Sequence, residues 1–150
     1  MAGRRWSFDW RGLALALLVF GAAGILIELL LLGHYEDAWQ WTPLVLISAG
    51  LVASAWIAGR PGALSLRIFG WLMAAHVAAG GLGLFLHLKA NVEFELELHP
   101  DNAGWSLVQE TLTGAIPALA PGAMFQLGLL GMLICWRHPA RSLGGESEGR

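Results

Sequence analysis

The sequence predicts an all-α membrane protein, a four-transmembrane-helix bundle that carries a small extracytoplasmic cap. Four apolar runs, at about 12–32, 42–59, 68–88 and 117–136, approach or reach the about 20 residues that a helix needs to cross a bilayer. Hydrophobic residues make up 56 % of the chain and charged residues 13 %, whereas soluble proteins average roughly 45–50 % and roughly 25 %. Length and composition therefore predict one membrane domain, residues 1–141, and no separate soluble domain.

Charged residues divide between the two sides of the four runs. The segments before the first run, between the second and third, and after the fourth contain Arg4, Arg5, Arg11, Arg60, Arg67, Arg137, Arg141 and Arg150. The other two connections contain Glu36, Asp37, Glu93, Glu95, Glu97, Asp101 and Glu110, with Lys89 as their only base. Because positive residues in short loops mark the cytoplasmic side, we expect both termini in the cytoplasm. The short length and minimal loops favour a bacterial inner membrane.

Tryptophan supports the same topology. Its ring is apolar and its N–H is polar, so it prefers the membrane–water boundary. The expected positions near the inner boundary are Trp6, Trp10, Trp56, Trp71 and Trp136, and those near the outer boundary are Trp39, Trp41 and Trp105. None of them falls in the middle of an apolar run.

Small residues and prolines shape the third and fourth runs. Ala75, Ala79 and Gly83 recur at four-residue spacing in the third run. Such a stripe lets another helix approach closely, which drives helix association in lipid. Pro117 and Pro121 bracket the start of the fourth run, where we expect them to bend the helix.

The outer cap, residues 89–111, is expected to contain one strand and one short amphipathic helix. Between Asn91 and His99, apolar residues alternate with glutamates and a histidine, which is the period of a half-buried strand. One strand alone is not stable in water, so it must pair within the chain or with a partner. Residues 105–112 suit a surface helix, and the Gly-, Ser- and Glu-rich tail 142–150 suits a disordered cytoplasmic segment.

Histidines and carboxylates gather on the predicted outer face. Imidazoles and carboxylates together form a ligand set that zinc or manganese accepts. Glu28 lies about five residues inside the outer end of the first run, where an ionised acid should face the bundle or a wet cavity. We expect a subset of the following residues to hold one divalent cation: Glu28, His34, Glu36, Asp37, His87, Glu93 and Glu95.

Other cofactors and enzyme classes find less support. A haem needs two histidines at equal depth on facing helices, and only His34 could match His87 in this way. His76 has no histidine partner, so we expect a hydrogen-bonded structural role for it. The sequence has no HExxH, GxSxG, CxxC or phosphate-binding glycine loop, and Cys135 is its only cysteine. No basic stripe with interleaved aromatics indicates nucleic acid. We assign no catalytic and no cofactor-binding residue.

Three functional hypotheses follow. The leading one is a small binding or accessory membrane protein with an extracytoplasmic acidic-histidine cation site. The second is a structural subunit or assembly factor of a larger membrane complex, in which Val92–Leu98 pairs with a partner's sheet edge. The third is an intramembrane metal-dependent enzyme with Glu28 as its base, or a transporter that forms its pore by oligomerising. The expected partners are the lipid bilayer and either another membrane protein or a second copy of the chain.

Overall fold

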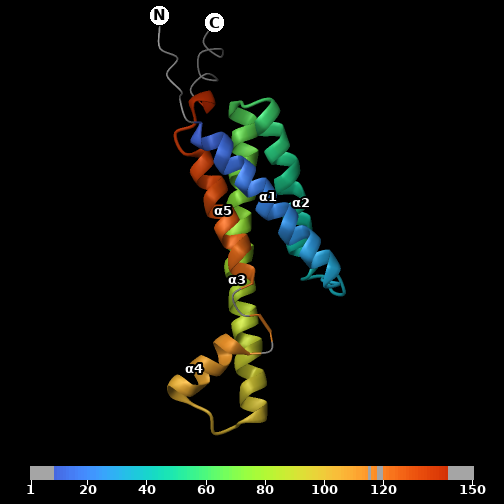
Figure 1. Ribbon diagram of the computed structural model, residues 1–150, viewed down its shortest axis with the longest axis vertical. Helices are drawn as coiled ribbons and strands as arrows, with labels where there is room; N and C mark the ends of the chain where they lie inside the picture. Colours follow the sequence, from blue (N-terminus) through green and yellow to red (C-terminus); the bar gives the residue numbers. More distant parts are fainter. Residues whose placement is uncertain (1–8, 115, 118–119, 142–150) are drawn as a thin grey trace, which may run out of the picture.

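Helices are the only regular secondary structure in the described part of the chain. The computed structural model describes residues 9–114, 116–117 and 120–141. Its helices are α1 (Trp10–Leu31), α2 (Trp41–Gly59), α3 (Ala63–Leu98), α4 (Gly104–Thr113), α5 (Pro121–Cys135) and the 3-10 helix η1 (Pro139–Arg141). Helices α1, α2, α3 and α5 pack as a bundle, and the second half of α3 projects beyond it together with α4 (Figure 1). The tail 142–150, like Arg4, Arg5 and Trp6, lies outside the described residues.

Three helices, α1, α2 and α3, are long and apolar enough to cross a membrane. Three of the four predicted spans are therefore helices whose length and composition suit a membrane crossing. Helix α5 is apolar but has only 15 residues, a length of about 22 Å at 1.5 Å per residue, against about 30 Å of hydrocarbon. It begins at Pro121 rather than at the predicted residue 117 because proline is favoured in the first turn of a helix, where its missing N–H is not needed. A fourth crossing stays a prediction.

One end of the bundle collects the start of α1, the α2–α3 connection and the end of α5 (Figure 1). We call it the arginine end, because every described arginine lies in these segments, in the first turns of α3 or in η1: Arg11, Arg60, Arg67, Arg137 and Arg141. The α1–α2 connection and the far half of α3, which carry most of the acids, lie away from it. The alternating direction of the four helices therefore separates the two charge types in space, as the sequence pattern predicted.

Helices α3 and α5 form the most extensive interface of the bundle, and glycines let their backbones approach closely. A Cβ on Gly80 would lie 2.5 Å from the Phe125 backbone nitrogen, and one on Gly128 would lie 2.7 Å from the Met73 carbonyl oxygen. Of the predicted stripe, Gly83 lies against Pro121, while Ala75 and Ala79 are half-buried. The close approach therefore centres on Gly80, between the predicted positions.

His76 has the structural role predicted from its isolation. It is 2 % exposed, and its Nδ1 lies 2.7 Å from the Leu72 carbonyl oxygen, to which it donates. The ring packs on Gly50 of α2, where an added Cβ would lie 3.0 Å from the histidine Cε1. The buried hydroxyl of Ser54 likewise has a partner within its own helix, since it donates to the Gly50 carbonyl oxygen at 2.7 Å.

Arg11 joins the start of α1 to the residues that follow α5, at the arginine end of the bundle. Its Nη2 donates to the carbonyl oxygens of Trp136 at 3.0 Å and Arg137 at 3.2 Å. Its guanidinium also lies 4.4 Å from the ring centroid of Trp10. A positive charge is favourable at a helix C-terminus, where backbone carbonyls lack intrahelical donors. Arg11 therefore stabilises the end of α5 while it ties α1 to it.

The strand predicted between Asn91 and His99 is wrong, because α3 continues as one helix to Leu98 and the described residues contain no strand. A lone strand would leave its backbone groups unpaired, whereas a helix satisfies them internally. Neither glycine nor proline interrupts residues 84–99, and Lys89 adds an ion pair of 3.4 Å with Glu93 one turn on. His99 ends the helix directly before Pro100, as the conformational restriction of a residue before proline favours.

Candidate functional site

The candidate site is the hairpin of α3 and α4, which we call the cap and define as residues 87–114. Helix α3 has 36 residues, about 54 Å at 1.5 Å per residue, whereas the hydrocarbon layer is about 30 Å thick. Its last three turns, residues 87–98, extend beyond α5, and α4 folds back beside them (Figure 1). The short helix of the predicted cap, residues 105–112, is confirmed as α4.

Asn91 holds the cap together. Its side chain is fully buried, and its Nδ2 donates to the carbonyl oxygens of Thr111 at 2.9 Å and Ile116 at 2.7 Å. Its Oδ1 accepts from the Ile116 backbone N–H at 3.2 Å. The amide thus uses both of its ends to close the segment after α4 onto α3. Gly114 allows this approach, since an added Cβ there would lie 2.9 Å from the Asn91 Cγ.

His87 makes a second tie one turn before Asn91. Its Nδ1 lies 3.1 Å from the Pro117 carbonyl oxygen and donates to it. Proline at 117 supplies only this acceptor, because it has no backbone N–H. His87 and Asn91 together attach the α4–α5 connection to α3 at two successive turns, so the cap is positioned relative to the bundle.

Two polar side chains inside the cap lack hydrogen-bond partners among the described residues. Glu95, one turn after Asn91 on the same helix face, is 8 % exposed and makes neither a hydrogen bond nor an ion pair there. Thr111 is 6 % exposed, and its Oγ1 is buried without a partner. Buried polar groups are normally satisfied, and exceptions concentrate at functional sites. Among the described residues the only other such buried atom is Arg11 Nε, at the opposite end of the fold.

The outer surface of the cap combines exposed apolar and acidic side chains. The apolar ones come from both helices: Phe94, Leu96, Leu98, Trp105, Val108 and Leu112. On α4, Trp105, Val108 and Leu112 share one face at helical spacing, and Trp105 is 71 % exposed. The exposed acids are Glu93, Glu97, Asp101 and Glu110. A surface that is both apolar and acidic suits contact with another macromolecule.

No family model, curated protein or solved structure matches this chain.

The predicted cation ligands of the α1–α2 region are engaged locally or face outward. Asp37 acts as a turn residue, since its Oδ1 accepts from the backbone N–H groups of Trp39 at 2.8 Å and Gln40 at 2.9 Å. Glu36 is exposed, and His34 is half-buried. Glu28 is exposed on the surface of α1 rather than turned toward the bundle, which differs from the sequence-based expectation.

The remaining predicted ligands lie in the cap. His87 and Glu95 share the α3 face that meets α4, whereas Glu93 is exposed and paired with Lys89. Figure 1 places the α1–α2 connection beside the bundle, well apart from α4. Among the described residues, no group of three or more His, Cys, Asp or Glu side chains could hold a metal ion. The structure therefore does not bring the seven residues together.

The sequence-based reasoning missed the roles of Asn91 and Thr111. The alternation of apolar and acidic residues from Asn91 to His99 predicts a strand, and in a strand Asn91 has no distinct role. The informative signal was the spacing of His87, Asn91 and Glu95, which recur every four residues and so share one face of a helix. Thr111 gave no comparable signal, because its burial depends on how α4 docks.

Proposed function

We propose that this chain is an accessory subunit of a membrane protein complex that holds its cap beside the membrane to dock a partner protein. The main support for this proposal is the Asn91 amide, which closes α4 onto α3 by hydrogen bonds to Thr111 and Ile116. A cap positioned in this way presents a preorganised surface, which lowers the entropic cost of binding. The hypothesis of a partner sheet edge is replaced, since α3 offers a helix face instead of a strand.

Charge indicates the chemistry of the partner. Within residues 87–114 the acids are Glu93, Glu95, Glu97, Asp101 and Glu110, against the single base Lys89. A second copy would bring two acidic caps together, and like charges in contact suppress association. We therefore expect an extracytoplasmic region of another protein that carries basic residues around an apolar patch.

The proposed orientation of the protein in the membrane rests on the position of its arginines. Arg11, Arg60, Arg67 and Arg137 all belong to one end of the bundle, and positive residues in short loops mark the cytoplasmic side. We accordingly place the termini in the cytoplasm and the cap outside it. A bacterial inner membrane is the proposed location, because the chain is short and its loops are minimal.

Site-specific photo-crosslinking in intact cells tests the docking surface with a matched pair of positions. Trp105 of the cap is 71 % exposed, and Trp71 of α3 near the arginine end is 73 % exposed. A photoreactive residue at 105 should give one discrete protein adduct, and the same residue at 71 should not give it. Glu97→Lys, which adds a positive charge to the cap surface, should weaken that adduct at least several-fold.

Two outcomes would overturn the proposal. One is the absence of any protein adduct at position 105 while lipid adducts form there, which would assign the α4 face to the membrane surface. The other is an adduct that corresponds to two copies of this chain, which would make the cap a self-association surface.

The divalent-cation site remains a prediction. Its ligands fall into two groups, in the α1–α2 region and in the cap, so one ion could bridge them only after a rearrangement or between two copies. The enzyme and transporter hypotheses remain predictions as well. They depend on Glu28, which lies on the exposed surface of α1.

A further inference from the structure

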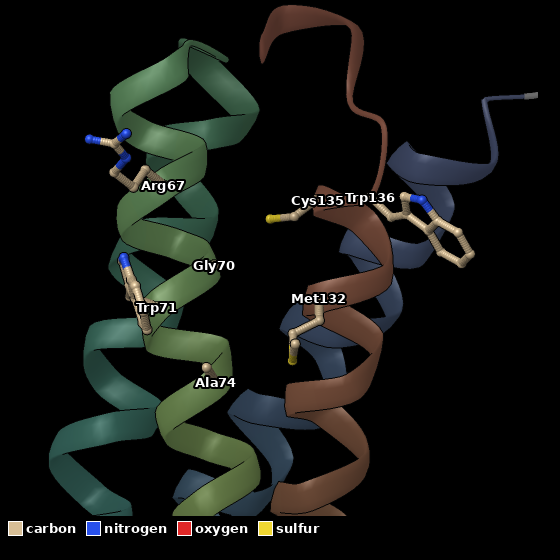
Figure 2. Close-up of a pocket in the computed structure, with 7 residues that line it drawn as sticks. All are labelled: Arg67, Gly70, Trp71, Ala74, Met132, Cys135 and Trp136. Carbon is tan, nitrogen blue, oxygen red and sulfur yellow. The ribbon is translucent and has the colours of Figure 1, made fainter.

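A groove lies between α3 and α5 near the arginine end of the bundle, far from the cap (Figure 2). Its volume is about 390 Å³, within the range of about 300–1,000 Å³ that is typical of small-molecule sites. Trp71 lines it from α3 and Trp136 from α5, with the Trp136 ring turned outward from the gap, while Cys135 points across the gap toward α3 (Figure 2). The groove is open rather than enclosed, so a long molecule could lie in it lengthwise.

The groove changes from charged to apolar along its length. Arg67 is the fifth residue of α3 and so lies close to the arginine end. Ala74 follows two turns further along the helix, about 10 Å deeper at 1.5 Å per residue. Met132 lines the facing wall one turn before the end of α5. A ligand that matches this gradient has one anionic end and one hydrocarbon end.

Arg67 is available to such a ligand. Its side chain is exposed, and among residues 9–114, 116–117 and 120–141 its guanidinium has neither an ion pair nor a hydrogen bond. None of the residues that line the groove is acidic, so nothing in it would repel an anion. A guanidinium suits a phosphate because its fork of N–H donors can bind two oxygens at once.

We propose that this groove binds one anionic phospholipid, with its phosphate at Arg67 and an acyl chain against Ala74 and Met132. The two tryptophans at its rim support this choice, because indole rings favour the depth of the lipid headgroups. Basic pockets between membrane-spanning helices commonly take anionic headgroups. A soluble ligand would leave the apolar half of the groove unused, since that half faces the hydrocarbon layer.

The test measures binding of phosphatidylglycerol to the full-length protein in mild detergent by native mass spectrometry. Arg67→Gln should weaken binding about fivefold, the equivalent of about 1 kcal/mol for one arginine at a membrane surface. Arg60→Gln is the matched control, because Arg60 is also exposed at this end but does not line the groove. It should change the dissociation constant less than twofold. Phosphatidylcholine should bind several-fold more weakly than phosphatidylglycerol.

A second pair of variants tests the apolar half of the groove. Ala74→Phe fills the groove without a change of charge and should reduce phosphatidylglycerol binding several-fold. Val52→Phe adds the same ring to the exposed face of α2, where Val52 is 72 % exposed, and should leave binding unchanged. A thermal unfolding curve in detergent alone checks that both variants are folded.

Three results would overturn the proposal. Equal losses in Arg67→Gln and Arg60→Gln would mean that the lipid senses only the general positive charge of this end. Unchanged binding in folded Ala74→Phe would place the lipid elsewhere. Inorganic phosphate that displaces the lipid at equal concentration would identify a phosphate site without any role for the acyl chain.

Discussion

Asn91 and Ile116 exchange hydrogen bonds in both directions across 25 positions of sequence: Asn91 Nδ2 donates to the Ile116 carbonyl oxygen at 2.7 Å, and the Ile116 backbone N–H donates to Asn91 Oδ1 at 3.2 Å. The side-chain amide thus imitates a backbone partner for a residue that belongs to no helix. This exchange fixes where the chain returns from the cap to the bundle, and it makes Asn91 the most informative position to change.

Asn91→Leu is expected to release the cap from α3. Leucine has a similar branched shape but no hydrogen-bonding group, so the carbonyls of Thr111 and Ile116 and one N–H lose their buried partner. A buried group left unsatisfied costs about 1–3 kcal/mol, and here the Thr111 carbonyl is buried while the two Ile116 groups are partly exposed. The free energy of cap closure should therefore fall by about 2 kcal/mol. Hydrogen exchange in residues 104–113 should speed up at least tenfold while exchange in α2 stays unchanged.

The control for this change is Asn102→Leu. Asn102 lies in the turn between α3 and α4, and its side chain makes no hydrogen bond with the described residues. Exchange in α4 should remain as in the unaltered protein. If both variants loosen α4 equally, the cap does not depend on the Asn91 amide.

Gly80→Ala is expected to separate α3 from α5. Its Cβ would lie 2.5 Å from the Phe125 backbone nitrogen and 2.9 Å from the Phe125 Cα. Backbone atoms cannot move aside as the end of a flexible side chain can, so the helices must shift, and overpacking of this kind costs about 1–3 kcal/mol. Thermal unfolding in detergent should show a clear loss of stability.

Gly24→Ala is the matched helical control for the α3–α5 interface. Gly24 lies in α1, and nothing lies within 4 Å of an added Cβ there. Alanine forms helix better than glycine by roughly 0.5–1 kcal/mol, so this variant should be as stable as the original protein or slightly more stable. Equal destabilisation by both substitutions would contradict a specific close contact at Gly80.

Glu95→Gln is expected to stabilise the cap. Glu95 is 8 % exposed as a residue, and its carboxylate has no partner among the described residues, so folding partly desolvates a charge that no neighbouring group compensates. A neutral amide of the same size removes this cost, so α4 should exchange its amide hydrogens more slowly. Glu97→Gln, at an exposed position of the same helix, should have no effect. A loss of stability in Glu95→Gln would show instead that the carboxylate makes a stabilising contact.

Isothermal titration with zinc, manganese and calcium decides the cation hypothesis. Three or more ligands must converge to hold such an ion, and among the described residues no group of three or more His, Cys, Asp or Glu side chains does so. Stoichiometric binding tighter than about millimolar that is lost in both His34→Ala and His87→Ala would support the hypothesis. It would indicate that the α1–α2 connection and the cap come together around the ion, whereas the absence of such binding would refute the hypothesis.

The length of the apolar runs predicted the bounds of the first two helices closely. Helices α1 and α2 begin and end within about two residues of the predicted spans, since hydrocarbon thickness and the rise of a helix set that length. The isolation of His76 likewise predicted its hydrogen-bonded structural role. The sequence predicted the position of the third helix but not where it ends, because residues 89–98 lie beyond the apolar run and are still helical.

The secondary structure of the cap could not be predicted from local sequence patterns. The alternation from Val92 to Leu98 has the period of a strand, yet the four-residue spacing of His87, Asn91 and Glu95 in the same segment has that of a helix. The choice between the two depends on whether an antiparallel partner or α4 is available to cover the segment, and no local pattern contains that information.

By itself, then, the amino-acid order determined that the chain forms long apolar helices, their approximate extent and the separation of arginines from acids, because each depends on residues close together in the chain. Only the tertiary structure decided that the seven suspected ligands stay dispersed, that Asn91 closes the cap, and that Arg67 stands above an apolar groove. Those outcomes depend on the rotation and crossing of packed helices, which are set by contacts such as Gly80 on Phe125 between residues far apart in sequence.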